Sequence, residues 1–249
     1  MAPPTKADPW LPYRKPRPGA RVRLFCFPYA GGGASMYRTW QDELPVSIEV
    51  CAVQLPGREG RMRDAPVAEM ARLVPLIADG LSPHLGQPFA LFGHSMGAAI
   101  AFELGRELRR RGGPRPLHLF ASACPAPHLP DEDATHGLPE AELIERMRSL
   151  GGMSEEVLQH RELMEMILPV FRADASITET YAHAEEAPLD VPITAFGGIE
   201  DPKATRHEMD AWRQHTRGAF ALAMVAGNHF YIQGDGRRPV LATVARTIG

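Results

Sequence analysis

Short apolar runs alternate with longer runs of helical period from residue 21 to the end of the chain. The apolar runs are rich in Val, Ile, Leu and Phe, and several are apolar on both faces, which is typical of strands in a buried parallel sheet. Six segments have this character: 21–27, 48–55, 88–93, 116–123, 191–198 and 219–225. Apolar residues recur at helical spacing in four further segments: 67–81, 96–112, 204–216 and 237–248. Strands alternating with helices predict an α/β fold with a mostly parallel, doubly wound sheet.

The alternation is interrupted between the fourth and fifth predicted strands. About 65 residues there contain no convincing strand, and a structureless loop of that length is uncommon in a compact domain. Amphipathic helical patterns occur within it at 138–152 and 154–181. We therefore predict a helical insertion at about residues 125–186.

The start of the chain has a different composition. Residues 1–20 contain six prolines, which oppose both helices and central strands. We predict an extended N-terminal arm over residues 1–20 that lies outside the core. The remaining residues, 21–249, are then expected to form one domain that contains the insertion.

Charge and cysteine usage exclude several classes of protein. A net charge of −3 gives no electrostatic reason to expect nucleic-acid binding. No apolar run approaches the ~20 residues that span a bilayer, and no export signal is evident. Cys26, Cys51 and Cys124 lie far apart without a C-x-x-C motif, which favours buried free thiols in a reducing compartment. We expect a cytoplasmic protein that binds neither membrane nor metal.

The segment Gly93-His94-Ser95-Met96-Gly97 matches G-x-S-x-G, the strand-to-helix turn that exposes a nucleophilic serine. The motif occurs by chance in some chains, but here it falls where an apolar strand ends and a helix of small residues begins. The alternative, a serine helix cap, accounts for Ser95 but not for the two flanking glycines. We therefore predict that Ser95 is a nucleophile.

A serine hydroxyl needs a base and an acid that orients the base, and in this fold they follow the serine in the order acid, then histidine. His229 directly follows the last predicted strand, and Asp201 follows the strand before it, so both are expected at the same edge of the sheet as Ser95. Glu200 is the alternative acid. Solvated or structural roles suit other histidines better, namely His84, His118, His160, His183, His207 and His215.

The oxyanion formed during acyl transfer needs preorganised N–H donors. One is expected from Met96, the residue after the serine. The other is expected from Ala30, in a glycine-rich turn that follows the first predicted strand. A phosphate-binding loop is the competing interpretation of that turn, but the chain has neither G-K-[ST] nor G-x-G-x-x-G there.

Six stretches together resemble the type II thioesterases of polyketide and non-ribosomal peptide assembly lines. They are FPYAGGGASMY at 27–37, VQLPGREGR at 53–61, GHSMGA at 93–98, RAD at 172–174, the Asp201 loop, and GNHFY at 227–231. The resemblance runs from about residue 24 to the C-terminus. It implies an α/β-hydrolase fold in which a helical lid, here the insertion, precedes the acid-bearing strand.

The resemblance also implies roles for the site residues. Ser95 corresponds to the nucleophile, His229 to the base and Asp201 to the orienting acid, while Ala30 and Met96 correspond to the oxyanion donors. The implied substrate is an acyl thioester on the phosphopantetheine arm of an acyl or peptidyl carrier protein. The implied function is the removal of stalled or aberrant acyl units by a monomeric enzyme without a cofactor of its own.

Some alternatives stay open at this point. A stand-alone carboxylesterase or lipase would share every catalytic residue, and a non-catalytic carrier-protein binder would keep the insertion without the chemistry. Four arginines close the helix after Ser95, where they complement the helix dipole or, as a weaker hypothesis, contact an acidic carrier protein; they are Arg106, Arg109, Arg110 and Arg111. Asn228 stands where the family commonly has glycine, and asparagine tolerates the left-handed conformation better than most residues.

Overall fold

A six-stranded, fully parallel sheet forms the centre of the molecule in the computed structural model, which describes residues 8–130 and 135–249. The strand order is β2-β1-β3-β4-β5-β6. The strands are β1 (Val22–Phe27), β2 (Ile48–Ala52), β3 (Phe89–His94), β4 (Leu119–Ser122), β5 (Ile193–Gly198) and β6 (Phe220–Val225). Five of them lie within segments predicted as strands, and β3 extends one residue beyond its predicted segment, to His94, so the α/β prediction is confirmed.

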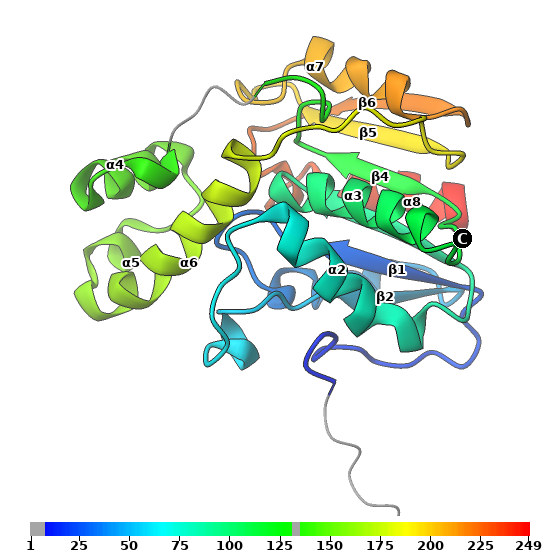
Figure 1. Cartoon of the computed structure of the whole chain (residues 1–249), viewed down its shortest axis with the longest axis horizontal. Helices are drawn as coiled ribbons and strands as arrows, with labels where there is room; N and C mark the ends of the chain where they lie inside the picture. Colours follow the sequence, from blue (N-terminus) through cyan, green and yellow to red (C-terminus); the bar gives the residue numbers. More distant parts are fainter. Residues whose placement is uncertain (1–7, 131–134) are drawn as a thin grey trace, which may run out of the picture.

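Helices cover both faces of the sheet (Figure 1). On one face, α2 (Met70–Leu81) and α3 (Met96–Arg110) pack on alternate strand residues such as Phe25 and Leu91. On the other face, α1 (Trp40–Glu43) and α8 (Arg237–Ile248) pack on the intervening residues, among them Leu24 and Phe92. Alternate side chains of each strand thus enter two separate apolar layers, which is why the predicted strands are apolar on both faces.

The helix predicted at 204–216 is shorter than expected. A capping box at Thr205 starts α7 (Arg206–Asp210), and the chain then tightens into a 3₁₀ turn over Ala211–His215. Trp212 and His215 are both buried. Residues three apart lie on the same side of a 3₁₀ helix, so the side chains of Trp212 and His215 both face the core.

The inserted segment is helical, as predicted. It contains α4 (Glu140–Leu150), α5 (Glu155–Gln159) and α6 (Arg161–Glu179), while residues 131–134 lie outside the described part. These helices bury a small apolar cluster of their own and lie beside the carboxyl ends of the strands (Figure 1). The insertion is therefore placed at the edge of the sheet that carries Ser95.

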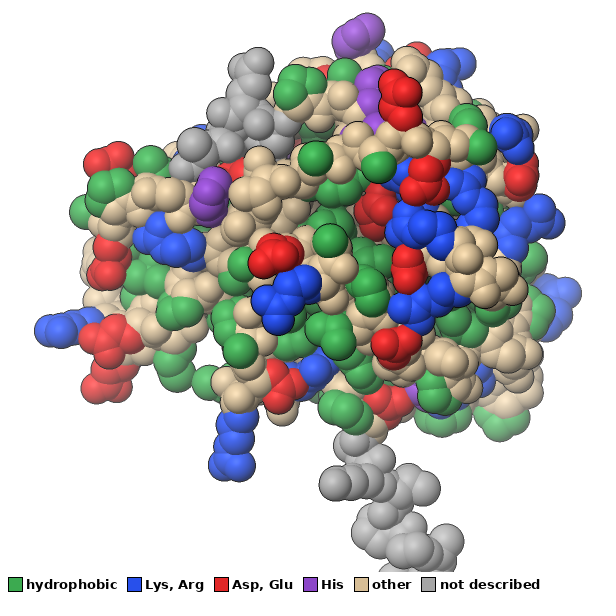
Figure 2. Space-filling model, viewed as in Figure 1, with side chains coloured by type: hydrophobic (Ala, Val, Ile, Leu, Met, Phe, Trp, Pro, Cys, Tyr) green, Lys and Arg blue, Asp and Glu red, His purple; other side chains and the backbone are tan. Residues whose placement is uncertain are grey.

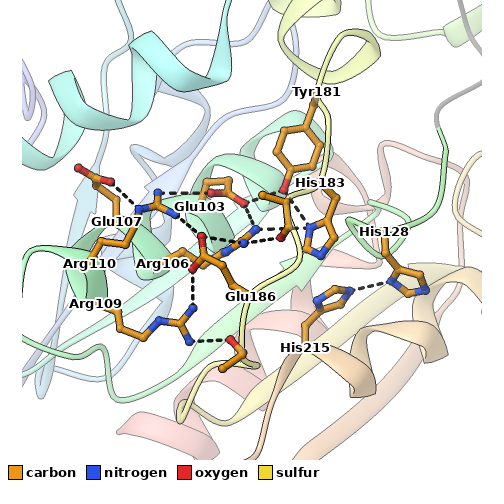
Figure 3. Close-up of polar contacts among 12 residues, drawn as sticks. Glu103, Arg106, Glu107, Arg109, Arg110, His128, Tyr181, His183, Glu186 and His215 are labelled. Carbon is orange, nitrogen blue, oxygen red and sulfur yellow. Dashed lines mark hydrogen bonds and ion pairs between the residues drawn. The ribbon is translucent and has the colours of Figure 1, made fainter.

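Arginines at the end of α3 hold the chain that leads from α6 back to β5 (Figure 3). Arg109 donates to Glu186 and to the carbonyl oxygen of Ala187, both at 2.7 Å, and Arg110 donates to Glu186 at 2.8 Å. Although partial burial alone would raise it, hydrogen bonds from Arg109 and Arg106 lower the pKa of Glu186 to about 2. Acidic side chains lie between the basic ones over this region (Figure 2), so these cations already have partners within the chain.

Part of the N-terminal arm packs on the domain, contrary to the expectation. Leu11 is buried in the core on the α2 side, and a side chain at Gly80 would collide with the indole of Trp10. The amide of Arg17 donates to Glu49 at 2.9 Å. Prolines prevent a helix here, but they do not prevent an extended segment from burying the apolar residues between them. Residues 1–7 of the predicted arm lie outside the described residues.

Cys26 and Cys51 are free thiols. Cys26 and Cys51 are buried as expected, and burial beside Glu49 raises the pKa of Cys51 to about 12. Cys124 is half-buried, so the expectation of burial is wrong there. Within residues 8–130 and 135–249, we find no helix with the length and apolarity needed to cross a membrane.

His118, a buried histidine directly before β4, predicts that the protein loses stability in acid. Burial lowers the pKa of His118 to about 4, while the unfolded chain keeps a value near 6.5. Between these values the unfolded state binds the proton and the folded state does not, so stability falls as the pH falls from about 6.5 to about 4, by about 3 kcal/mol in total. Urea unfolding of the wild type and His118→Leu across this range measures the effect. We expect the slope of unfolding free energy against pH to be smaller in the variant, by the equivalent of about one proton. Equal slopes in the two proteins would contradict the assignment of this effect to His118.

Candidate active site

Ser95 lies in a tight turn between β3 and α3. Its backbone has φ 53° and ψ −125°, a strained conformation for a residue with a side chain. A Cβ atom at Gly93 would lie 2.0 Å from the carbonyl oxygen of Gly97, and a Cβ atom at Gly97 would lie 2.2 Å from that of Phe27. Both glycines of the motif are thus required by close backbone approaches, which a simple helix cap would not need.

The hydroxyl of Ser95 is within hydrogen-bond distance of His229. Ser95 Oγ lies 3.0 Å from His229 Nε2, and His229 Nδ1 lies 2.8 Å from Asp201 Oδ2. Because a carboxylate only accepts, Nδ1 carries the ring proton, and Nε2 accepts from the serine. The Asp201 side chain is fully buried, and the His229 side chain is 12% exposed. The structure therefore brings together the three residues predicted from the sequence.

Glu200, the alternative acid, is placed differently. It is exposed, and its backbone N–H donates to the carbonyl of Gly227 at 3.1 Å. The second carboxylate oxygen of Asp201 accepts from the amide of Lys203 at 2.9 Å, which fixes the Asp201 side chain in its turn. The carboxylate that contacts His229 is that of Asp201.

The two predicted N–H donors follow neighbouring strands of the sheet, Ala30 after β1 and Met96 after β3. Met96 is the first residue of α3, where an N–H has no partner inside the helix. Ala30 follows β1 and precedes Gly31, whose φ of 78° turns the chain sharply. A Cβ atom at Gly31 would lie 3.2 Å from Phe171 Cδ2, so α6 packs directly on this turn. Parallel neighbouring strands end at one edge of the sheet, so both segments start at the edge that carries Ser95.

A buried ion pair ties the glycine-rich turn to the insertion. Asp174, on α6, is fully buried and contacts Arg58 through two hydrogen bonds of 2.5 and 2.7 Å. The same carboxylate accepts from the amide of Gly31 at 2.7 Å, and Arg58 donates to the carbonyl of Gly32 at 3.3 Å. The VQLPGREGR and RAD stretches noted in the sequence therefore meet at one point, a contact that their spacing alone did not predict.

Removing one partner of this pair is expected to destabilise the fold. Asp174→Ala leaves the Arg58 guanidinium buried without its counterion, which costs about 3–5 kcal/mol of unfolding free energy. Urea unfolding at pH 7 measures the loss. Glu165→Ala is the matched control on the same helix, because its pair with Arg161 is exposed and worth less than about 1 kcal/mol. A loss no larger than that of the control would contradict the prediction.

Asn228 needs no left-handed conformation. Within the described residues it is not among the non-glycine residues with positive φ, whereas its neighbour Gly227 has φ 116°. The Asn228 side chain accepts from the amide of Phe230 at 3.0 Å and so closes the turn around the histidine. Asparagine in place of the family's usual glycine therefore does not strain the backbone at this position.

One polar residue of the site was not assigned from the sequence. His94, between Gly93 and Ser95, is fully buried, and its Nε2 lies 2.8 Å from the backbone oxygen of His229. Its position inside the G-x-S-x-G motif was the available signal. Within the described part of the chain, no group of three or more His, Cys, Asp or Glu residues is arranged to hold a metal ion.

Comparison with known proteins decides the family. A model of the thioesterase domain matches residues 22–248, which includes every residue of the site described above. The chain belongs to the thioesterase family. This thioesterase is accordingly a hydrolase of thioesters, and its parallel sheet with flanking helices is that of the α/β-hydrolase neighbours.

Individual relatives support the same placement. RedJ, a thioesterase from the prodiginine pathway of Streptomyces coelicolor, is 42% identical, with a TM-score of 0.88 over 93% of this chain and 87% of its own. BorB, a type II thioesterase from the borrelidin cluster, is 38% identical, with a TM-score of 0.88 over 98% and 100% of the two chains. LgrE of Brevibacillus parabrevis, named a linear gramicidin dehydrogenase, is 44% identical over 96% of this chain and 92% of its own. This chain has no G-x-G-x-x-G dinucleotide fingerprint to match that name.

Proposed function

We propose that this protein is a serine thioesterase that hydrolyses acyl groups from the phosphopantetheine thiol of carrier proteins. The contact that carries the proposal is the 3.0 Å approach of Ser95 Oγ to His229 Nε2, with Asp201 on the other ring nitrogen. A serine hydroxyl is a weak nucleophile until such a base removes its proton. The relatives from assembly-line pathways supply the substrate class, because a triad alone does not distinguish thioesters from oxygen esters.

The proposed reaction has two halves. Ser95 Oγ attacks the thioester carbonyl while His229 takes its proton, and the N–H groups of Ala30 and Met96 stabilise the oxyanion. The C–S bond then breaks, the proton passes from His229 to the leaving thiolate, and an acyl-serine remains. Water, deprotonated by His229, attacks this ester and releases the acid, which restores the Ser95 hydroxyl. A thiol of pKa near 8.5 leaves easily, so acid assistance matters less than for an amide.

Apolar side chains of the insertion support a role as a lid over the acyl group. Phe171 and Met153 approach Gly31 next to the proposed oxyanion donor, and Phe230, next to the base, contacts Gly152. The acyl group would bind between these side chains and Ser95, with the carrier protein outside and its flexible arm reaching inward. The biological role would be the removal of stalled or aberrant acyl units during polyketide or non-ribosomal peptide synthesis.

The substrate class is tested by comparing one acyl group on three carriers. We expect kcat/KM to be highest for the acyl group on a holo-carrier protein, lower for the same acyl-pantetheine, and lowest for the matched oxygen ester. Equal or faster hydrolysis of the oxygen ester would favour a stand-alone esterase. Carrier binding without hydrolysis, and without labelling of Ser95 by a fluorophosphonate, would favour a non-catalytic binder.

A further inference from the structure

A buried histidine lies directly beside the proposed nucleophile but takes no part in the reaction described above. His94 is the last residue of β3 and is fully buried. Its ring lies against Tyr231 and His229, with centroid separations of 5.3 and 5.6 Å. A histidine buried this deeply is costly unless both nitrogens have partners.

Both ring nitrogens of His94 do have partners, and they define its tautomer. Nε2 lies 2.8 Å from the backbone oxygen of His229, and Nδ1 lies 2.8 Å from Ser122 Oγ. A carbonyl oxygen only accepts, so Nε2 carries the proton. Burial and the neighbouring His229 hold the pKa of His94 well below its usual value, so the ring is neutral. Nδ1 therefore accepts, and the Ser122 hydroxyl donates to it.

The hydrogen bonds continue from Ser122 back to the loop that carries His229. The Ser122 hydroxyl donates its hydrogen bond to His94, so its oxygen accepts from the hydroxyl of Tyr231, 2.5 Å away. The Tyr231 hydroxyl also donates to the carbonyl of Phe196 at 2.9 Å, so its proton is shared. Tyr231 is two residues after His229, and the segment 229–231 is thus held at both of its ends. The backbone oxygen of Ser122 accepts from the Ser95 amide at 2.7 Å, so the end of β4 supports the nucleophile as well.

Fixing the His229 backbone matters because the imidazole must satisfy two distances at once. Its Nε2 contacts Ser95 at 3.0 Å while its Nδ1 contacts Asp201 at 2.8 Å, and a shift of about 1 Å at a reacting group can cost about 10²-fold in rate. We infer that His94 is a positioning residue, which holds His229 in register with Ser95 and Asp201 by donating its Nε2 hydrogen to the His229 carbonyl. This inference rests on the proposed function of Ser95 and His229.

Steady-state hydrolysis of an acyl-carrier protein by His94 variants tests the inference. His94→Leu removes both hydrogen bonds, and we expect kcat to fall about 10²-fold with KM changed less than about twofold. Labelling of Ser95 by a fluorophosphonate should slow in parallel, because it depends on the same activation of the hydroxyl. His94→Gln retains an N–H donor and an oxygen, and we expect it to recover at least tenfold of the lost kcat.

His118→Leu is the matched control. His118 is also buried and neutral, and it donates to or accepts from Thr194 Oγ1 at 2.8 Å, away from the three residues of the site. We expect it to lower stability but to leave kcat within about twofold of the wild type. A His94→Leu enzyme with the kcat of this control, or a His94→Gln enzyme no better than His94→Leu, would overturn the inference.

Two further outcomes are informative. If His94→Leu does not fold, Ser122→Ala decides, because it removes the partner of Nδ1 and leaves the ring in place. We then expect kcat to fall several-fold, and a wild-type kcat would count against the inference. If the wild type itself is neither labelled at Ser95 nor active on any acyl substrate, the proposed function fails, and that result is distinct from a wild type that is active while its His94 variants are unimpaired.

Discussion

Ser95→Ala is expected to reduce kcat for acyl-carrier hydrolysis by about 10⁴- to 10⁶-fold while leaving the fold intact. The substitution removes one oxygen, which lies at a partly exposed turn and fills no core volume. The hydroxyl, His229 and Asp201 act as one unit, so adding His229→Ala to Ser95→Ala should cause little further loss. Single-turnover hydrolysis and urea unfolding, measured on the same preparations, give the two quantities.

Ser35→Ala is a suitable control for this experiment. Ser35 is exposed and donates to Glu59, and it takes no part in the proposed chemistry. We expect wild-type kcat for that variant. Near wild-type turnover by Ser95→Ala would mean that the nucleophile has been assigned to the wrong residue, whatever the family.

Asp201→Asn is expected to lower kcat by about 10⁴-fold. The amide that replaces the carboxylate can donate to Nδ1 and so favours the ring tautomer with its proton on Nε2, which cannot accept from Ser95. Asp201 is buried, so no water takes the place of its charge when the imidazolium forms. The acylation rate, followed by release of the free thiol, measures the effect.

Glu200→Gln is the matched comparison, because it makes the same chemical change at the adjacent, exposed residue. We expect kcat within about twofold of the wild type. The polar contact described for Glu200 is made by its backbone N–H, which donates to the Gly227 carbonyl, and the residue is exposed. If Glu200→Gln were the damaging change and Asp201→Asn the harmless one, the acid would have to be reassigned.

The order of strands and helices followed from the sequence because each face of this sheet is covered. Strands with helices on both sides must be apolar at consecutive positions, and that pattern is visible in residues such as Leu24 to Phe27. The glycines around Ser95 also indicated a tight turn from the sequence alone, since only glycine fits where backbone atoms approach within van der Waals distance. The order of Asp201 and His229 after the serine added the remaining members, because parallel strands all end at one edge.

Other features depended on contacts between residues far apart in the chain. Leu11 is buried despite its proline-rich surroundings because it packs into the same apolar layer as α2, and no periodicity of the sequence reports such a contact. The sequence left Glu200 open as an alternative to Asp201. The contact that separates them is the 2.8 Å approach of Asp201 Oδ2 to the Nδ1 of His229, 28 residues away. These are decided by packing, which follows from the whole chain and not from a local pattern.

The sequence by itself determined the strand and helix order, the helical insertion, and Ser95 and His229 as candidate members of the triad, because burial period and obligatory glycines are local properties. Only the tertiary structure showed that Asp174 reaches the amide of Gly31 and that His94 reaches the carbonyl of His229. Each of these contacts joins residues more than 130 positions apart. A buried polar group must find a partner, but which backbone atom it meets is fixed by how the layers pack, and that information is absent from the spacing of residues along the chain.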